Sequence, residues 1–179
     1  MLVGILVLAT LIYFVAIPYL HNETKKISPA RTANLDLDGS SLEVGYSSPS
    51  KKGRVVPFGK IWRTGVNEPT TFTTTQQIKI INKTLPAGTY SLWTIPNKES
   101  WKVIFNTEVP DWGVTQVDGK QTTHATKNDY VTVDVSVKKL AVPIEEFSIS
   151  FDNEELNQKS QNFLSLAYDT TKIMVPIYK

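Results

Sequence analysis

Apolar and polar residues alternate along much of the chain after residue 33. Residues 131–137 (VTVDVSV) and 147–151 (FSISF) alternate strictly between the two kinds of side chain. A period of two is typical of a β-strand that buries one face. Shorter runs with the same pattern occur at 35–37, 42–46, 101–105, 164–168 and 173–177. The pattern therefore predicts many strands that share one core.

Turn-forming residues separate these runs, at 38–39, 82–83, 86–88, 96–97, 118–119, 152–153 and 169–170. The pair Asp169-Thr170 predicts a closing hairpin between 161–169 and 171–179. One stretch, 153–159, favours a short helix, and no alternation of strands with long helices is visible. We expect an all-β fold, an antiparallel β-sandwich of immunoglobulin-like or jelly-roll type.

The first 20 residues break the pattern, because Met1 to Leu20 contain no charged residue and are almost wholly apolar. About 20 residues at 1.5 Å each are enough to cross a hydrocarbon layer of about 30 Å. We therefore predict a transmembrane helix over 1–20 that precedes the sandwich. A cleaved signal sequence is the alternative, although a basic start and a small-residue cleavage site are not evident.

The remainder divides into two parts. Residues 21–32 are polar, contain Pro29 and show no periodicity, so we expect a linker there. Residues 33–179 are one domain's worth of chain and form the predicted β-sandwich. Lys25, Lys26 and Arg31 follow the span and no basic residue precedes it, which by charge counting favours a cytoplasmic domain.

The composition of the chain excludes several classes of functional site. The 179 residues include no cysteine and only two histidines, with a net charge of +2. These counts exclude a disulfide scaffold, a cysteine-ligated metal site and a cysteine nucleophile. No glycine-rich phosphate loop and no basic patch with interleaved aromatics is present, so we expect no nucleic-acid partner. Asp111, Asp118 and His124 are a weak metal candidate without defined ligand spacing, and we expect no metal and no cofactor.

The segment 60–68 (KIWRTGVNE) carries the densest polar chemistry. A strand there would place Trp62 and Arg63 on opposite faces, and Gly65 would allow a turn that presents Asn67 and Glu68 together. The structural interpretation is that Trp62 fills the core and Glu68 neutralises Arg63. The functional interpretation makes Arg63, Asn67 and Glu68 the polar floor of a cleft for a small polar or sugar-like ligand.

Tryptophans supply the other candidate surface. Flat indole faces stack on sugar rings, so Trp93, Trp101 and Trp112 could form a carbohydrate platform. Core packing is the competing interpretation, because aromatic residues of a small β domain often fill its interior. The candidates for ligand binding or interaction are therefore Trp62, Arg63, Asn67, Glu68, Trp93 and Trp101, and no residue is assigned a catalytic role.

Four ordered motifs carry a family resemblance: YSSPSKKGR (46–54), GKIWRTGVNE (59–68), LPAGTYSLWTIP (85–96) and WKVIFN (101–106), followed by EEFSISFDN (145–153). The chain resembles the DUF2911 family, a bacterial domain of unknown function, over nearly all of 33–179. Ser48 departs from the family pattern, which usually has Arg there. The family is associated with exported proteins, chiefly of Bacteroidetes, and the resemblance implies a periplasmic domain, against the charge count.

Together these observations predict a single-pass protein of the bacterial inner membrane with its C-terminal domain in the periplasm. We expect a non-catalytic accessory or interaction subunit of a cell-envelope complex, with protein partners. A module that binds a small ligand or carbohydrate in a cleft near Arg63, Asn67 and Glu68 is the alternative. A hydrolase that uses Glu68 is the third hypothesis.

Overall fold

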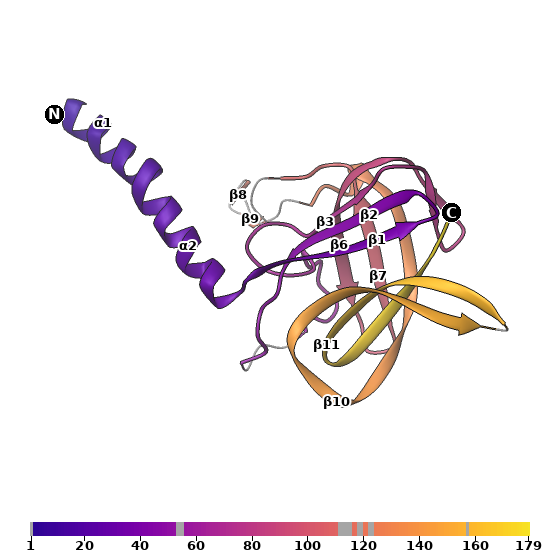
Figure 1. Cartoon of the computed structure of the whole chain (residues 1–179). Coiled ribbons are helices and arrows are strands. Elements are labelled where there is room, and N and C mark those ends of the chain that lie inside the picture. Colours follow the sequence, from indigo (N-terminus) through magenta and orange to yellow (C-terminus); the bar gives the residue numbers. More distant parts are fainter. Residues whose placement is uncertain (1, 53–55, 111–115, 118–119, 122–123, 157) are drawn as a thin grey trace.

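The computed structural model describes residues 2–52, 56–110, 116–117, 120–121, 124–156 and 158–179. The chain begins with a long helix, made of α1 (Leu2–Leu11), a π-helical turn η1 (Ile12–Ala16) and α2 (Ile17–Ile27). This helix projects away from the β domain (Figure 1). Its segment Val3–Ile27 is long and apolar enough to cross a membrane, and none of the tested window is buried against the domain. The helix is thus a candidate membrane anchor.

The helix extends through most of the segment that was predicted to be a linker. It ends at Ile27, and β1 (Ala30–Leu37) begins after only Ser28 and Pro29. An ion pair of Lys26 with Glu23, at 2.5 Å and one turn apart, supports the last turns. Pro29 disfavours helical geometry in the residue before it, and Ser28 has left the helix with φ −139°. Ser28 and Pro29 therefore separate the helix from the sheet.

Nine strands form one antiparallel sheet in the order β1-β2-β3-β6-β7-β10-β11-β4-β5. Their bounds are β2 Ser40–Ser47, β3 Thr71–Thr74, β4 Ile78–Ile80, β5 Lys83–Leu85, β6 Gly88–Pro96, β7 Ser100–Asn106, β10 Asp129–Leu156 and β11 Lys159–Tyr178. A small separate pair, β8 (Gln116–Val117) with β9 (Lys120–Gln121), and a 3₁₀ turn η2 (Thr126–Asn128) lie between β7 and β10. The predicted all-β, sandwich-like class with one N-terminal apolar helix is confirmed.

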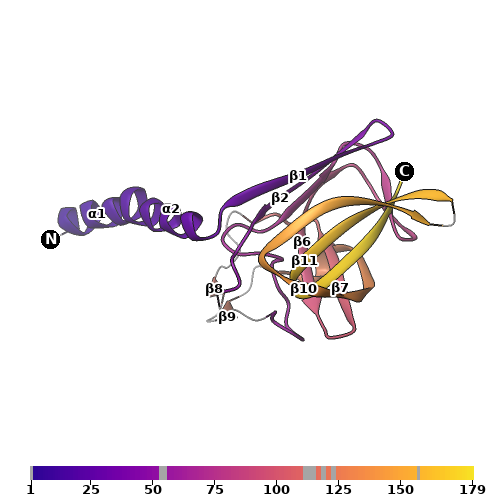
Figure 2. The same cartoon turned by 60° about the horizontal axis from the view of Figure 1, so that its bottom comes forward.

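The 28-residue strand β10 folds the sheet over itself. Its residues 129–136 pair with β7, and residues 137–156 pair with β11. Register shifts between Lys139 and Ser148, just after the strand changes partner, interrupt its pairing with β11 and bend it. Figure 2 shows β10 and β11 as a long, curved ribbon that turns away from β7. One strand therefore belongs to both layers and closes the core between them.

Two predictions near the C-terminus are wrong. Asp169 does not turn a hairpin, because β11 continues through it as one strand. Asp169 has a positive φ of 56° and faces Ile144 at the register shift, so the turn signal marks a strand irregularity. The chain reverses instead between Leu156 and Lys159, where a helix was expected.

The core lies between the two halves of the folded sheet. Its largest fully buried side chains include Trp101, Phe72, Phe105 and Phe147. The rings of Phe72 and Phe105 meet edge to face at 5.1 Å, a favoured aromatic geometry. Alternating residues of β7 and β10 supply much of the rest, as the period-two pattern predicted.

Candidate functional site

Trp62 connects the motif 62–68 to the sheet. Its main chain exchanges two hydrogen bonds with Thr94 of β6, at 2.7 and 2.8 Å. The indole points into the core, where it contacts the rings of Phe147 at 5.1 Å, Trp101 at 6.0 Å and Tyr168 at 6.3 Å. Trp62 thus packs as the structural interpretation described, and its Nε1 donates to the Gly65 carbonyl at 2.9 Å.

The loop after Trp62 has an unusual backbone. Thr64, Gly65 and Asn67 have φ of 56°, 150° and 62°. Non-glycine residues adopt such angles rarely, and they persist only where surrounding contacts over-determine them. The Thr70 hydroxyl donates to the Thr64 carbonyl at 2.7 Å, and a Cβ on Gly65 would lie 3.1 Å from the Ser47 carbonyl oxygen. The loop is therefore locked against β2.

Arg63 and Glu68 do not form the ion pair that one interpretation required. Arg63 Nη1 donates to the Asn67 carbonyl at 3.4 Å, and within the described residues no carboxylate lies within 4.0 Å of it. Burial lowers the pKa of the Arg63 guanidinium below its ordinary value. Glu68 instead pairs with Lys25 of α2 at 2.5 Å. The motif's acidic residue thus faces the N-terminal helix.

Asn67 also faces the helix end. Its side chain is buried, and its Nδ2 lies 3.5 Å from the Ser28 carbonyl oxygen. Ser48, where the family pattern usually has Arg, lies beside this junction. The Ser48 amide donates to the Pro29 carbonyl at 2.9 Å, and its hydroxyl donates to the Phe147 carbonyl at 2.7 Å. Through its amide and its hydroxyl, the buried Ser48 therefore links Pro29, directly before β1, to β10.

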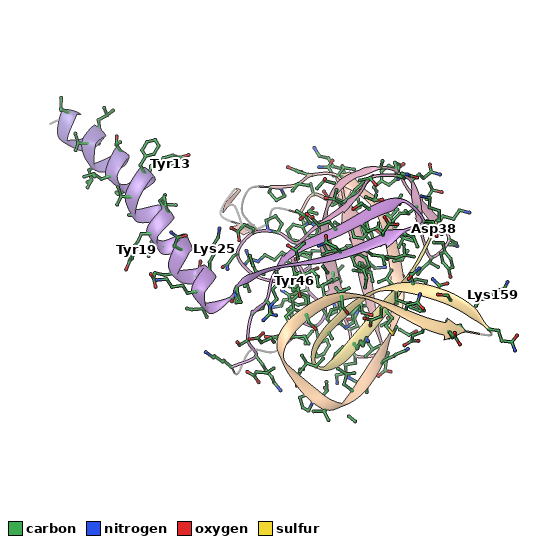
Figure 3. All side chains as sticks on the ribbon, in the orientation of Figure 1. Tyr13, Tyr19, Lys25, Asp38, Tyr46 and Lys159 are labelled. Carbon is green, nitrogen blue, oxygen red and sulfur yellow. The ribbon has the colours of Figure 1, made fainter. Side chains whose placement is uncertain are left out.

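A pocket of about 260 Å³ opens at this helix-proximal end of the sheet. Its lining comes from Ala30–Thr32 of β1, Gly45–Ser47 of β2, and Glu68, Pro69 and Thr71. Glu68 is the predicted floor residue that lines it, whereas Arg63 and Asn67 do not. Figure 3 shows Lys25 near the end of the helix and Tyr46 on the side of the domain that the helix meets, with Asp38 and Lys159 on the far side.

A second polar cluster, which the sequence reasoning missed, lies at the ends of β6, β7 and β10. His124 Nε2 lies 2.7 Å from Asp129 Oδ1, and the Asn106 amide donates to the same oxygen at 2.8 Å. The ring of Trp93 lies 5.4 Å from His124, and its Nε1 donates to the Ser91 hydroxyl at 2.8 Å. Only the strand register brings Asn106 beside Asp129, and sequence spacing carries no signal for it.

The structure bears as follows on the candidate tryptophan platform and on the weak metal candidate. Trp101 is fully buried and Trp93 is 4% exposed, so each contributes little ring surface to solvent. Asp111, Trp112 and Asp118 lie outside the described residues. Within the part of the chain that the structure describes, no group of three His, Asp or Glu residues could hold a metal ion.

The comparisons with known proteins give one match. The model of the family described as "Protein of unknown function (DUF2911)" matches residues 28–177, so the chain belongs to this family. No curated protein and no solved structure matches the chain. The matched region starts where the helix ends and covers the sheet up to Ile177, the residue before the end of β11.

Proposed function

We propose that this member of the DUF2911 family is a membrane-anchored, non-catalytic interaction subunit of a bacterial cell-envelope complex, with its β-sandwich in the periplasm. One observation carries the proposal. The N-terminal helix is apolar up to Leu20, none of its tested window is buried against the domain, and two residues join it to β1.

Energetics support a lipid environment for this helix. Burial of one Leu, Ile or Val side chain contributes about 1.5–3 kcal/mol, and the helix exposes many of them to solvent, Val3, Leu6 and Leu8 among them. An unpartnered helix of this kind is unfavourable in water. Insertion into a bilayer buries all of its apolar side chains at once.

The short connection supports a role close to the membrane surface. The polar end of the helix, residues 21–27, rises about 10 Å and the two connecting residues span at most about 7 Å, so the sandwich stays within about 20 Å of the hydrocarbon layer. The Lys25–Glu68 ion pair adds a contact between helix and domain. A partner of this domain is therefore a membrane protein or a protein that reaches the membrane surface.

The use of the polar groups favours interaction over catalysis. In the loop 62–70, the Asn67 amide and the Thr70 hydroxyl donate to main-chain carbonyls. Ser91 of β6 likewise donates to the Glu108 carbonyl at 2.6 Å. These hydrogen bonds hold the backbone in place. Support for the periplasmic side comes from the family's association with exported proteins, and large C-terminal domains can cross despite three basic residues after the span.

Gentle extraction from native membranes with crosslinking tests the proposal. We expect a defined protein to co-purify with the full chain in a fixed ratio. A matched variant replaces residues 2–24 with an unrelated single-span helix, and we expect it to retain the partner because the domain makes the contact. If the full chain is recovered as a lone monomer both after gentle extraction and after crosslinking, the proposal is wrong.

A small-ligand module is the second candidate, and the pocket beside Glu68 favours it. A volume of about 260 Å³ suits a ligand of a few heavy atoms, below the usual size of drug-sized sites. Binding of such a ligand and an interaction role are compatible in one chain.

A further inference from the structure

We propose that the pocket between β1, β2 and the segment 68–71 binds the phosphoethanolamine headgroup of a membrane lipid. The inference rests on the membrane-anchored part of the proposed function, and it assigns a ligand class to the junction between helix and sheet.

The position of the pocket points to the bilayer. Its first lining residue, Ala30, follows the last helical residue, Ile27, by three positions. Lys25, which pairs with Glu68 of the pocket, follows Leu20, the last residue of the apolar run, by five positions. Five helical residues rise about 7.5 Å, which places the pocket at the headgroup level of a bilayer that the apolar run crosses. A lipid headgroup thus meets this pocket without leaving the membrane.

The charges around the pocket match a headgroup that carries both signs. Two charged residues line it, Arg31 and Glu68. Arg31 pairs with Glu146 and Glu68 pairs with Lys25, each at 2.5 Å. All four side chains are between 37% and 49% exposed, and exposed pairs contribute at most about 1 kcal/mol. A ligand phosphate can therefore recruit Arg31 and Lys25 at little cost, and a ligand ammonium can take Glu68.

The neutral lining provides further recognition. The Thr32 and Thr71 hydroxyls make no side-chain hydrogen bond within the described residues, so both are available to a phosphate oxygen. Gly45 keeps the surface between them open, since a Cβ there would lie 3.1 Å from Thr71 Oγ1. Ala30 and Pro69 offer apolar contact to the ethanolamine methylenes.

The full chain in nanodiscs tests the inference. The bilayer contains phosphatidylcholine with equal minor fractions of phosphatidylethanolamine and phosphatidylglycerol, and native mass spectrometry reports which lipid stays bound. We expect retention of phosphatidylethanolamine, because a trimethylammonium cannot donate to Glu68 and glycerol carries no positive charge. Glu68→Gln should reduce this retention about threefold, the effect of one exposed charge pair.

Two further variants distinguish loss of the binding site from misfolding of the domain. Thr32→Trp fills the pocket from an exposed strand position without removing a charge, and we expect it to reduce retention as strongly. Glu155→Gln, on the exposed part of β10, is the matched control and should leave retention unchanged. Circular dichroism confirms that each variant keeps its strands.

A soluble arm separates the sources of the ligand. Free O-phosphoethanolamine should displace the retained lipid, which shows that the headgroup chemistry is recognised. If free O-phosphoethanolamine binds tightly but the chain shows no lipid preference, the assignment to a lipid is wrong. If the chain neither binds the free compound nor prefers phosphatidylethanolamine, the pocket is not a headgroup site. A chain that fails to enter nanodiscs refutes the anchor itself, whereas a chain that inserts without lipid preference refutes this inference alone.

Discussion

An isolated β-bridge at Trp62, in place of the short strand that was expected, divides the motif 62–68 between the core and the outer face. Trp62 and its bridge partner Thr94 face inward, and Arg63 follows on the other side. The indole therefore contributes to stability, whereas the guanidinium remains without a carboxylate partner among the described residues.

Truncation of Trp62 should destabilise the domain. Trp62→Ala removes a ring that contacts Phe147, Trp101 and Tyr168, and we expect a loss of about 3 kcal/mol in the free energy of unfolding. Urea unfolding followed by circular dichroism measures it. Phe58→Ala, at a 43% exposed position, should cost less than about 1 kcal/mol. Similar losses in both variants would contradict the assignment of Trp62 to the core.

Asp152 gives the domain a dependence on pH. Burial alone raises the pKa of its carboxyl, but hydrogen bonds from Lys172 at 2.7 Å and Ser150 at 2.9 Å, with the charge of Lys172, outweigh burial and hold the pKa below 3.8. A carboxyl whose pKa is lower in the folded chain than in the unfolded chain stabilises the fold at every pH above its unfolded-state pKa. This stabilisation is lost as the pH falls through the folded-state pKa.

The pH prediction follows from that sign. We expect the stability advantage of the wild-type chain over Asp152→Asn to shrink as pH falls below about 4. Urea unfolding at pH 7 and pH 3 measures the difference. Lys172→Met removes the partner that lowers the pKa, so its stability should depend less on pH in this range. An advantage that grows at pH 3 would refute the argument.

At the scale of the candidate site, sequence reasoning identified residues but not their partners. The spacing of Arg63 and Glu68 suggested a pair within one turn, yet Glu68 meets Lys25, 43 positions earlier. The contact depends on the helix continuing to Ile27, which the polar composition of 21–32 did not indicate. His124 and Asp129 likewise meet through a strand register that local spacing does not encode.

At the scale of the elements, the loop 64–70 has a constrained backbone, with positive φ at Thr64, Gly65 and Asn67. Gly65→Ala places a Cβ 3.1 Å from the Ser47 carbonyl oxygen at a φ of 150°, so we expect a loss of about 1–3 kcal/mol. Thermal unfolding measures it. Gly39→Asn is the matched control, because Gly39 has a φ of 78° with open space around it and asparagine tolerates this region. Its cost should stay within about 0.5 kcal/mol.

Strands were predicted well because one buried face imposes a period of two on each segment. The alternation at 131–137 and 147–151 became parts of β10. The long hairpin β10–β11 was not foreseen, since its course depends on cross-strand bonds such as Ser160 Oγ to Asn153 Oδ1 at 2.9 Å. Asn and Asp tolerate backbone angles that other residues rarely adopt, and such angles occur both in turns and in β-bulges. An Asn or Asp in the sequence therefore does not distinguish a turn from a bulge.

For the whole molecule, the absence of cysteine makes the orientation of the domain measurable. Lys159 is exposed on the far side of the domain from the helix (Figure 3), and any cysteine placed there is unique in the chain. A periplasmic domain requires that Lys159→Cys reacts with a membrane-impermeant maleimide in intact spheroplasts as fast as after lysis.

A cysteine inserted after Met1 provides the opposite report and should react only after lysis. The two labels together separate orientation from accessibility, because a slow reaction at both sites indicates burial and reversed rates indicate a cytoplasmic domain. Reversed rates would mean that Lys25, Lys26 and Arg31 obey charge counting. The pocket between β1 and β2 would then face the lipids of the inner leaflet, and its headgroup preference would remain testable in nanodiscs, which expose both leaflets.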